Sequence, residues 1–406
     1  MFIMKNIKKI ILIVLAFFIC GTIFYFILPH VYSNDIKYDI NQDFGGDLKN
    51  EIKSEEINNI ETEEIVEEIV APISHVVTPS QVKALYMSGW VAGSLDFRNS
   101  LIKIIKDTEL NAVVIDIKDS TGRLSFSIDD PEIQKLGSAE NRIKDIKELT
   151  NLLHSHNIYI IGRISVFQDP YLAKLKPEWA VKKISDGGVW KDKKGLSFLD
   201  PTNKNVHDYT LSVALHSYNL GFDEINLDYI RYPSDGNMKD IDYNLAPGTT
   251  RADNIENFFK YFSTEIKKSV NIPISADLFG LTTEVTNDMG IGQIWEKTIP
   301  YFDYVCPMVY PSHYPAGYGG YNKPALYPYE VINKALASAV IRTKAIGQDP
   351  KKIRPWIQDF DLGAVYTKEM VRAQIKATYD NGLDSWLLWD PSNKYTPSAL
   401  LLEKSI

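Results

Sequence analysis

Short runs of β-branched and aromatic residues alternate with longer stretches of helical periodicity from residue 82 onward. Eight runs have the length and composition of strands: residues 82–91, 112–119, 158–167, 223–231, 274–280, 304–311, 353–360 and 385–390. Helical stretches lie between them, as at 97–108, 143–155, 206–220 and 254–270. This alternation is typical of βα units and a parallel sheet. Eight repeats predict an α/β protein, with a (β/α)8 TIM barrel over residues 81–406.

A doubly wound open sheet is the alternative arrangement of βα units. Such sheets usually have fewer strands, and no glycine-rich phosphate loop follows the first predicted strand. The barrel is therefore the favoured prediction.

The N-terminal residues have the pattern of a membrane anchor. Residues 10–28 contain 19 positions without a charge, close to the roughly 20 that a helix needs to cross a bilayer. Lys5, Lys8 and Lys9 precede this stretch, so the positive-inside rule places the rest of the chain outside the cell. We expect residues 1–30 to form a single-pass anchor in the cell membrane. A cleaved signal peptide, which would make the protein secreted, is the alternative.

Residues 31–80 differ from the rest in carrying two acidic runs, at 51–56 and 61–68, with few aromatic residues. Like charges repel one another, and there is little apolar surface to bury. We therefore expect a flexible linker that holds the barrel away from the membrane.

Composition narrows the function classes. The formal net charge is −8, and no basic stripe lies beyond the first residues, which argues against a nucleic-acid partner. Of the two cysteines, Cys20 lies in the predicted membrane span and Cys306 in a predicted buried strand, so we do not expect them to form a disulfide. The seven histidines lack the spacing of metal ligands. The sequence thus predicts no metal and no cofactor.

The predicted strands carry polar residues where a barrel should carry its active site. Glu224, Asn226 and Asp228 alternate with Ile225 and Leu227, so the polar three share one face of the fourth strand. A polar face inside a buried parallel sheet is unfavourable unless it forms a satisfied network or lines a functional centre. Because barrel active sites form at the C-terminal ends of strands, we favour a functional centre.

Two carboxyl groups on neighbouring strands suit the cleavage of glycosidic bonds. One must be ionised to attack or stabilise the sugar cation, and the other must hold a proton for the leaving oxygen. Asp228 has Arg231 and Asn226 nearby in sequence to keep it ionised. Asp277 sits among Ala276, Leu278 and Phe279, where desolvation would raise its pKa. We expect Asp228 to be the nucleophile or stabiliser and Asp277 the general acid/base, although the two roles can be exchanged.

Other side chains at the strand ends are candidates for holding the sugar. They are Asp116, Lys118, Arg163, Asn226, Arg231, Tyr310, Trp356, Gln358, Asp359, Trp386 and Asp390. Trp356 and Trp386 have the strand parity expected of side chains that face the barrel centre.

Three segments resemble a known family. GFDEINLDYIRYP at 221–233, VIDIKD at 114–119 and IGRISVF at 161–167 are similar to the bacterial "putative glycosyl hydrolase" domain family over about residues 84–390. The resemblance implies a barrel related to α-amylase-type enzymes and a carbohydrate substrate. In those barrels the positions similar to Asp228, Asp277 and Asp359 are the nucleophile, the acid and an assisting carboxylate. This chain departs from them in having Asp on the fifth strand and Asn226 where an Arg would stand.

Chitinase-like family 18 barrels are a second resemblance. Asp223, Asn226 and Asp228, the Met308-Val-Tyr310 segment, and Trp386 are similar to their motifs. Ile230 replaces their catalytic Glu, so chitinase chemistry is not expected, although a sugar-binding groove is.

These observations predict a glycoside hydrolase that acts on an extracellular or cell-surface polysaccharide. The alternative function is a catalytically inactive, carbohydrate-binding barrel associated with the cell wall. Sugar identity, linkage and stereochemical outcome are left open.

Overall fold

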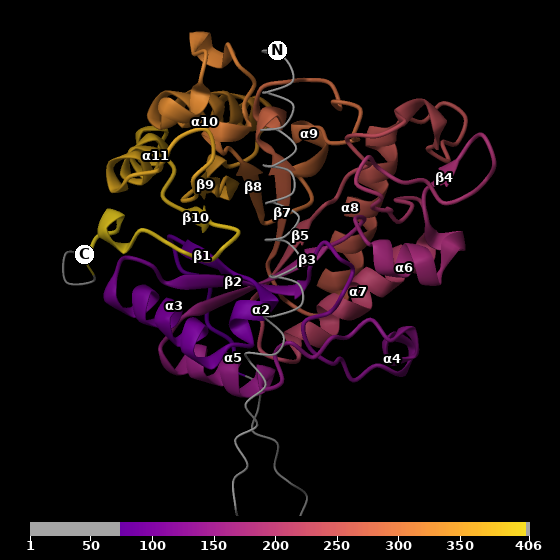
Figure 1. Cartoon of the computed structure of the whole chain (residues 1–406), viewed down its shortest axis with the longest axis horizontal. Helices are drawn as coiled ribbons and strands as arrows, with labels where there is room; N and C mark the ends of the chain where they lie inside the picture. The colour runs from indigo at the N-terminus through magenta and orange to yellow at the C-terminus, as the bar shows by residue number, and fades with distance from the viewer. Residues whose placement is uncertain (1–73, 403–406) are drawn as a thin grey trace, which may run out of the picture. The chain divides into compact units, whose positions relative to one another are not determined.

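A closed barrel of eight parallel strands forms the centre of the part of the chain that the computed structural model describes, residues 74–402 (Figure 1). The strands are β1 (Lys83–Met87), β2 (Ala112–Lys118), β3 (Tyr159–Ser165), β5 (Glu224–Asp228), β7 (Ile274–Phe279), β8 (Tyr304–Met308), β9 (Trp356–Gln358) and β10 (Trp386–Trp389). They are hydrogen-bonded in the order β1-β10-β9-β8-β7-β5-β3-β2. Pairing of β1 with β10 closes the barrel, so the predicted (β/α)8 fold is confirmed and an open sheet is excluded.

Helices surround the strands in Figure 1. They are α2 (Gly89–Ala92), α3 (Leu95–Asp107), α4 (Pro131–Leu136), α5 (Ile146–Ser155), α6 (Pro170–Leu175), α7 (Lys204–Tyr218), α8 (Arg251–Ser269), α9 (Trp295–Thr298), α10 (Pro328–Ala345) and α11 (Lys368–Asp380). Local chemistry fixes where they begin. Asp169 caps α6 ahead of Pro170, and Thr250 and Asp253 form a capping box on α8.

Each predicted strand run contains one barrel strand, but the first run is too long. Only Lys83–Met87 is strand, because Ser88 then caps the short helix α2. A feature that was not predicted is a small antiparallel pair, β4 (Lys182–Lys183) with β6 (Ile241–Asp242), built from the long loops after β3 and β5.

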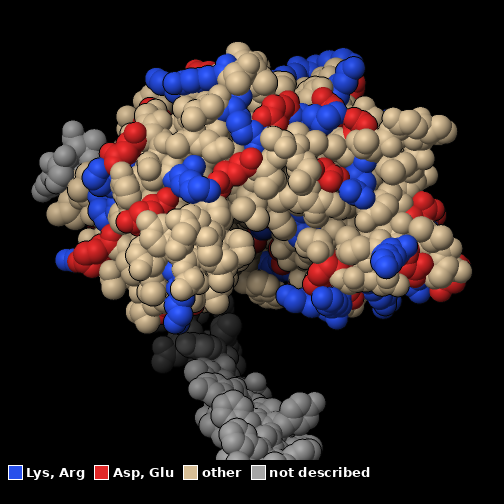
Figure 2. Space-filling view, turned by 90° about the horizontal axis from the view of Figure 1, so that it is seen from above, with Lys and Arg blue, Asp and Glu red and all other residues tan. Residues whose placement is uncertain are grey.

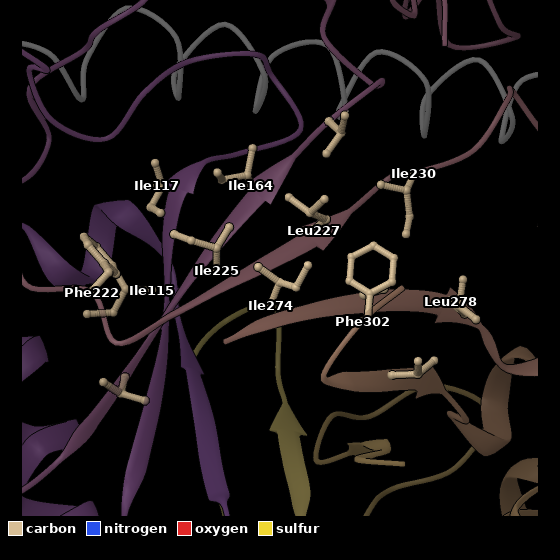
Figure 3. Packing of buried hydrophobic residues seen from close by; sticks show 14 of the residues in the cluster. Ile115, Ile117, Ile164, Phe222, Ile225, Leu227, Ile230, Ile274, Leu278 and Phe302 are labelled. Carbon is tan, nitrogen blue, oxygen red and sulfur yellow. The ribbon is translucent and has the colours of Figure 1, made fainter. Parts of the chain in front are cut away.

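The main core lies between the barrel and its helices. Ile225 and Leu227 of β5 point outward, together with residues such as Ile115, Ile164 and Leu278 from other strands (Figure 3). Period-two alternation then turns Glu224, Asn226 and Asp228 into the barrel, as their spacing predicts.

The barrel interior contains a fully buried ion pair. Arg354 donates to both carboxylate oxygens of Glu224, at 2.9 and 3.1 Å, and neither side chain is exposed. Ser275 and Tyr159 also donate to Glu224, at 2.6 and 3.0 Å. Because these bonds satisfy both oxygens, the polar face of β5 is supported at this level by hydrogen bonds rather than by solvent.

The charged surface is mixed. Figure 2 shows Lys and Arg interspersed with Asp and Glu on one face. Several of the contacts are helical pairs, such as Lys103 with Asp107 at 2.6 Å. Pairs this exposed contribute little stability.

The first described residues pack on the end of the barrel where the strands begin. Val76 donates its N–H to Asp223, which precedes β5, and Thr78 bonds Tyr159, the first residue of β3. Residues 74–80, placed in the linker by their sequence, thus contact the barrel. The predicted anchor at 1–30 and the rest of the linker lie outside the described residues. Within residues 74–402, no helix has the length and apolar character needed to span a bilayer.

Candidate active site

A cavity of about 370 Å³ opens at the C-terminal ends of the barrel strands. Its lining combines charged and aromatic side chains from β3 and the strands and loops that follow: Arg163, Asp228, Tyr229, Arg231, Asp277, Phe279, Gly280, Leu281, Met308, Tyr310, His313, Tyr314, Trp356 and Trp389. A concave site with apolar walls and a few converging polar groups is the usual form of a small-molecule or sugar site.

Asp228 is held by a cation on the neighbouring strand. Nε and Nη2 of Arg163 both donate to its Oδ2, at 3.0 and 2.5 Å. The backbone N–H of Tyr229 donates to its Oδ1 at 2.6 Å. Arg163, rather than the Arg231 expected from sequence, is therefore the cation that binds the carboxyl group of Asp228.

A second carboxyl group holds Arg163 in position. Its Nη1 donates to Asp116 at 2.6 Å, and Tyr86 donates to the other oxygen of Asp116 at 2.6 Å. Asp116 is not among the residues that line the cavity. It orients the guanidinium that binds Asp228.

The backbone is strained directly after Asp228. Tyr229 has φ of +52°, a left-handed conformation that is unfavourable for a residue with a bulky side chain. Strain of this kind clusters at functional sites, where the surrounding structure enforces it. Here the turn directs the Tyr229 N–H at Asp228 and places the Tyr229 side chain in the cavity wall.

Asp277, on β7, lies in a different environment. Its Oδ1 accepts hydrogen bonds from Asn226 at 2.9 Å and from Trp356 at 2.8 Å. Only 1% of the residue is exposed. Burial, followed by the charge of Asp228, raises the pKa of Asp277 well above its usual range. The direction is the one expected from its apolar neighbours in sequence.

The two carboxyl groups face the same guanidinium. Nε of Arg163 lies 3.0 Å from Oδ2 of Asp228 and 4.0 Å from Oδ2 of Asp277, so these two oxygens are at most about 7 Å apart. An ionised and a protonated carboxyl within this range are the two groups that glycosidic cleavage requires.

Aromatic rings form the walls. Trp389 stacks on Tyr86 with ring centroids 4.1 Å apart, and meets Trp356 edge-on at 5.5 Å. On the opposite side the Arg231 guanidinium lies 4.8 Å from the Phe279 ring and 5.1 Å from the Tyr229 ring. Such surfaces suit the apolar faces of sugar rings.

Comparison with known proteins identifies the family. The model of the family described as "Putative glycosyl hydrolase domain" matches residues 84–395. The chain belongs to this family. The match includes every barrel strand except the first residue of β1, and it includes both Asp228 and Asp277.

The chain is also similar to solved structures, one of which shares its fold with a TM-score above 0.5. The glycoside hydrolase domain of PgaB (BpsB) from Bordetella bronchiseptica is similar with a TM-score of 0.58 and 11% identity, covering 80% of this chain and 99% of that domain. A hypothetical protein from Ruminiclostridium thermocellum ATCC 27405 is 33% identical over 48% of this chain and 96% of its own, with a TM-score of 0.44. At 11% identity, the likeness to the Bordetella domain concerns the fold alone. No curated protein sequence matches this chain.

The structure brings six of the predicted site residues together in the cavity: Arg163, Asp228, Arg231, Asp277, Tyr310 and Trp356. Asp116 and Asn226 do not line the cavity, but Asp116 accepts a hydrogen bond from Arg163 and Asn226 donates one to Asp277. The other predicted binding residues, Lys118, Gln358, Asp359, Trp386 and Asp390, do not line the cavity.

Two of these residues point away from the barrel centre. A β-bulge between Asp116 and Lys118 breaks the alternation, and Lys118 instead forms a buried ion pair with Asp169 at 2.7 Å. Trp386 packs in the outer core and donates to Tyr379 of α11 at 3.2 Å. The orientation expected for Trp386 is therefore wrong, because Leu387 and Trp389 take the inward positions of β10.

The remaining three hold loops in place. Gln358 accepts from the Ser312 N–H at 3.2 Å, and Asp390 accepts from the Ser392 N–H at 2.5 Å. Asp359 accepts from both the N–H and the hydroxyl of Thr396, each at 2.8 Å, and burial raises its pKa to about 6. Its carboxylate thus ties the C-terminal segment to β9 instead of lining the cavity.

Eight cavity residues were not among the predicted site residues: Tyr229, Phe279, Gly280, Leu281, Met308, His313, Tyr314 and Trp389. Several follow the strand ends directly, so strand position alone would have found Tyr229 and Gly280. Tyr314 and His313 come from the Tyr-rich loop after β8, whose path no sequence pattern gives. Among residues 74–402, no cluster of His, Cys, Asp and Glu is arranged to hold a metal ion.

Proposed function

We propose that this chain hydrolyses O-glycosidic bonds, with Asp277 as the general acid and Asp228 as the ionised carboxylate. The observation that carries this proposal is the contrast between two carboxyl groups in one cavity. Arg163 binds Asp228 at 2.5 and 3.0 Å, whereas burial raises the pKa of Asp277. A carboxyl group whose pKa is raised by burial suits the role of the acid, and a carboxyl group paired with a guanidinium suits the role of the carboxylate.

Asp277 is arranged to donate a proton from one oxygen. Its Oδ1 already accepts two N–H bonds, which suits the carbonyl oxygen of a neutral acid. The proton then resides on Oδ2 and passes to the glycosidic oxygen as the bond to the anomeric carbon breaks. Water supplies the hydroxyl that the anomeric carbon receives, and its remaining proton returns to the carboxylate pair.

Asp228 provides negative charge where the sugar develops positive charge. It acts either by attacking the anomeric carbon, as retaining enzymes do, or by activating water, as inverting enzymes do. The limit of about 7 Å between the two Oδ2 atoms admits the roughly 5–5.5 Å of retention and the shorter part of the roughly 6.5–9.5 Å of inversion. The anomer released first distinguishes the two.

For the substrate we propose an extracellular or cell-surface polysaccharide. The support is the uncharged stretch at 10–28 with lysines before it, which predicts an exported, anchored domain. Protease added to intact cells should release a soluble barrel by cutting within residues 31–73. A barrel that stays protected until lysis would contradict this topology.

The hydrolase is tested by incubating the full chain with defined oligosaccharides and cell-wall polysaccharides and measuring new reducing ends. The matched control is Asp228→Asn, prepared identically. Reducing ends from the wild type and not from the variant support hydrolysis. Saturable sugar binding without new reducing ends would instead establish the catalytically inactive binding barrel.

A further inference from the structure

Trp90 is the most exposed tryptophan among the described residues, with 65% of its surface accessible. It belongs to α2, the short helix that begins two residues after the C-terminal end of β1. It therefore lies in the connection between β1 and α3, at the end of the barrel where the cavity opens.

A fixed cation covers one face of the Trp90 ring. The guanidinium of Arg142 lies 4.7 Å from the ring centroid. Arg142 is 3% exposed at its side chain and is held by Asp119 and Glu140, each at 2.5 Å. Because the arginine cannot move freely, it supports the indole from below and leaves the remaining surface to solvent.

The loop that carries Trp90 is closely packed. A Cβ at Gly89 would lie 2.2 Å from Oγ of Ser125, and a Cβ at Gly93 would lie 2.0 Å from the carbonyl oxygen of Arg142. Only glycine allows these approaches. Ser88 caps the helix at its start, accepting a hydrogen bond from Val91. The ring is thus presented on a rigid base, and its exposure does not come from a loose loop.

Trp90 is close in sequence to a residue that contacts the cavity wall. Tyr86, four residues before Trp90, stacks on Trp389, which lines the cavity. Four residues span at most about 14 Å. The backbone of Trp90 therefore lies no farther than this from the backbone of Tyr86, a separation that a glycan chain with one sugar in the cavity can bridge.

We propose that Trp90, supported by Arg142, is a distal subsite for a pyranose ring of a polymeric glycan. The apolar C–H face of the sugar stacks on the exposed face of the indole, as amphipathic rings do on aromatic side chains. The proposal rests on the proposed function for the substrate class, and it adds that the substrate is a chain of several sugars. The cavity alone serves the sugars next to the cleaved bond.

The test measures binding in a full-length chain that carries Asp277→Asn, so that turnover does not interfere. Titration calorimetry gives Kd for cellohexaose, chitohexaose and maltohexaose and for the disaccharide of each series. Trp90→Ala should lower the preference for the hexasaccharide over its disaccharide about fivefold, equivalent to about 1 kcal/mol. Trp90→Phe should restore most of the preference. Leu95→Ala removes a neighbouring side chain that is 61% exposed and should leave the preference unchanged.

The outcomes separate this proposal from the hydrolase. An unchanged preference in Trp90→Ala, or an equal loss in Leu95→Ala, overturns the subsite while hydrolysis stands. A hexasaccharide that binds through Trp90 but is never cleaved by the wild type upholds the subsite and refutes the hydrolase. Failure of all three hexasaccharides to bind at millimolar concentration overturns the subsite as stated.

Discussion

Two nitrogens of Arg163 donate hydrogen bonds to the same oxygen of Asp228, Nε at 3.0 Å and Nη2 at 2.5 Å. The same guanidinium also pairs with Asp116 at 2.6 Å and lies 4.0 Å from Asp277. One cation therefore serves three buried carboxyl groups. Full ionisation would leave two negative charges unbalanced in a low-dielectric site. Since the pKa of Asp277 is raised well above its usual range, a proton on Asp277 relieves this imbalance.

Replacing Asp228 by Asn preserves the shape of the side chain and removes its charge. If Asp228 attacks or stabilises the sugar cation, turnover should fall by at least a thousandfold, because that interaction is made in the transition state. Affinity for the sugar should change little. Steady-state kinetics together with calorimetric binding measure both quantities. A variant that keeps a tenth or more of the wild-type turnover would rule out this role.

Asp277→Asn should impair cleavage according to the leaving group. Natural glycosides need a proton on the departing oxygen and should lose most activity, whereas nitrophenyl glycosides should lose less. The wild-type rate should be high while Asp277 is protonated and fall as the pH rises through its raised pKa. Rate profiles against pH, recorded for both proteins, should show this alkaline fall only in the wild type. Equal losses on both substrate types would exclude proton donation by Asp277.

The same substitution should stabilise the fold above acidic pH. The folded pKa of Asp277 exceeds the unfolded value of about 3.9, so the wild type loses stability as the pH rises from about 4 to the folded pKa. Each pH unit in that window lowers the unfolding free energy by about 1.4 kcal/mol. Asp277→Asn has no proton to lose and should melt higher than the wild type at pH 7, with the difference vanishing near pH 4. A variant that melts lower at pH 7 would contradict this environment for Asp277.

Two tryptophans of β10 provide a matched pair for locating the bound sugar. Trp389 lines the cavity, while Trp386 packs against α11 on the outside of the barrel. A bound oligosaccharide should shift or quench the emission of the wild type. Trp389→Phe should lose most of that change and Trp386→Phe should keep it. The reverse pattern would place the sugar elsewhere.

The barrel was predictable because each βα unit repeats a strong local pattern, and strand alternation placed Glu224, Asn226 and Asp228 inside it. Contacts between strands were not predictable in the same way. Asp228 is held by Arg163 from β3, not by Arg231 three positions away, because a strand aligns residues with the neighbouring strand.

One strand irregularity and one wrong parity account for further differences. The bulge in β2 turned Lys118 outward, and the parity of β10 was misassigned, so Trp386 was expected where Trp389 lies. The bulge has no signature in the sequence, and the inward face of β10 is set by its regular register with β9, which the sequence of one strand does not give. Loop residues such as Tyr314 enter the cavity through paths that strand patterns do not determine.

The contacts of Val76 and Thr78 lie at one end of the barrel axis and the cavity at the other. They attach the incoming chain where β3 and β5 begin, while the cavity lies where these strands end. The entrance to the cavity and the point of attachment are thus at opposite poles of the barrel axis. The chain that leads into the barrel at Val76 and Thr78 therefore makes these contacts without covering the mouth of the cavity, so the opposite pole stays free for a long substrate to approach.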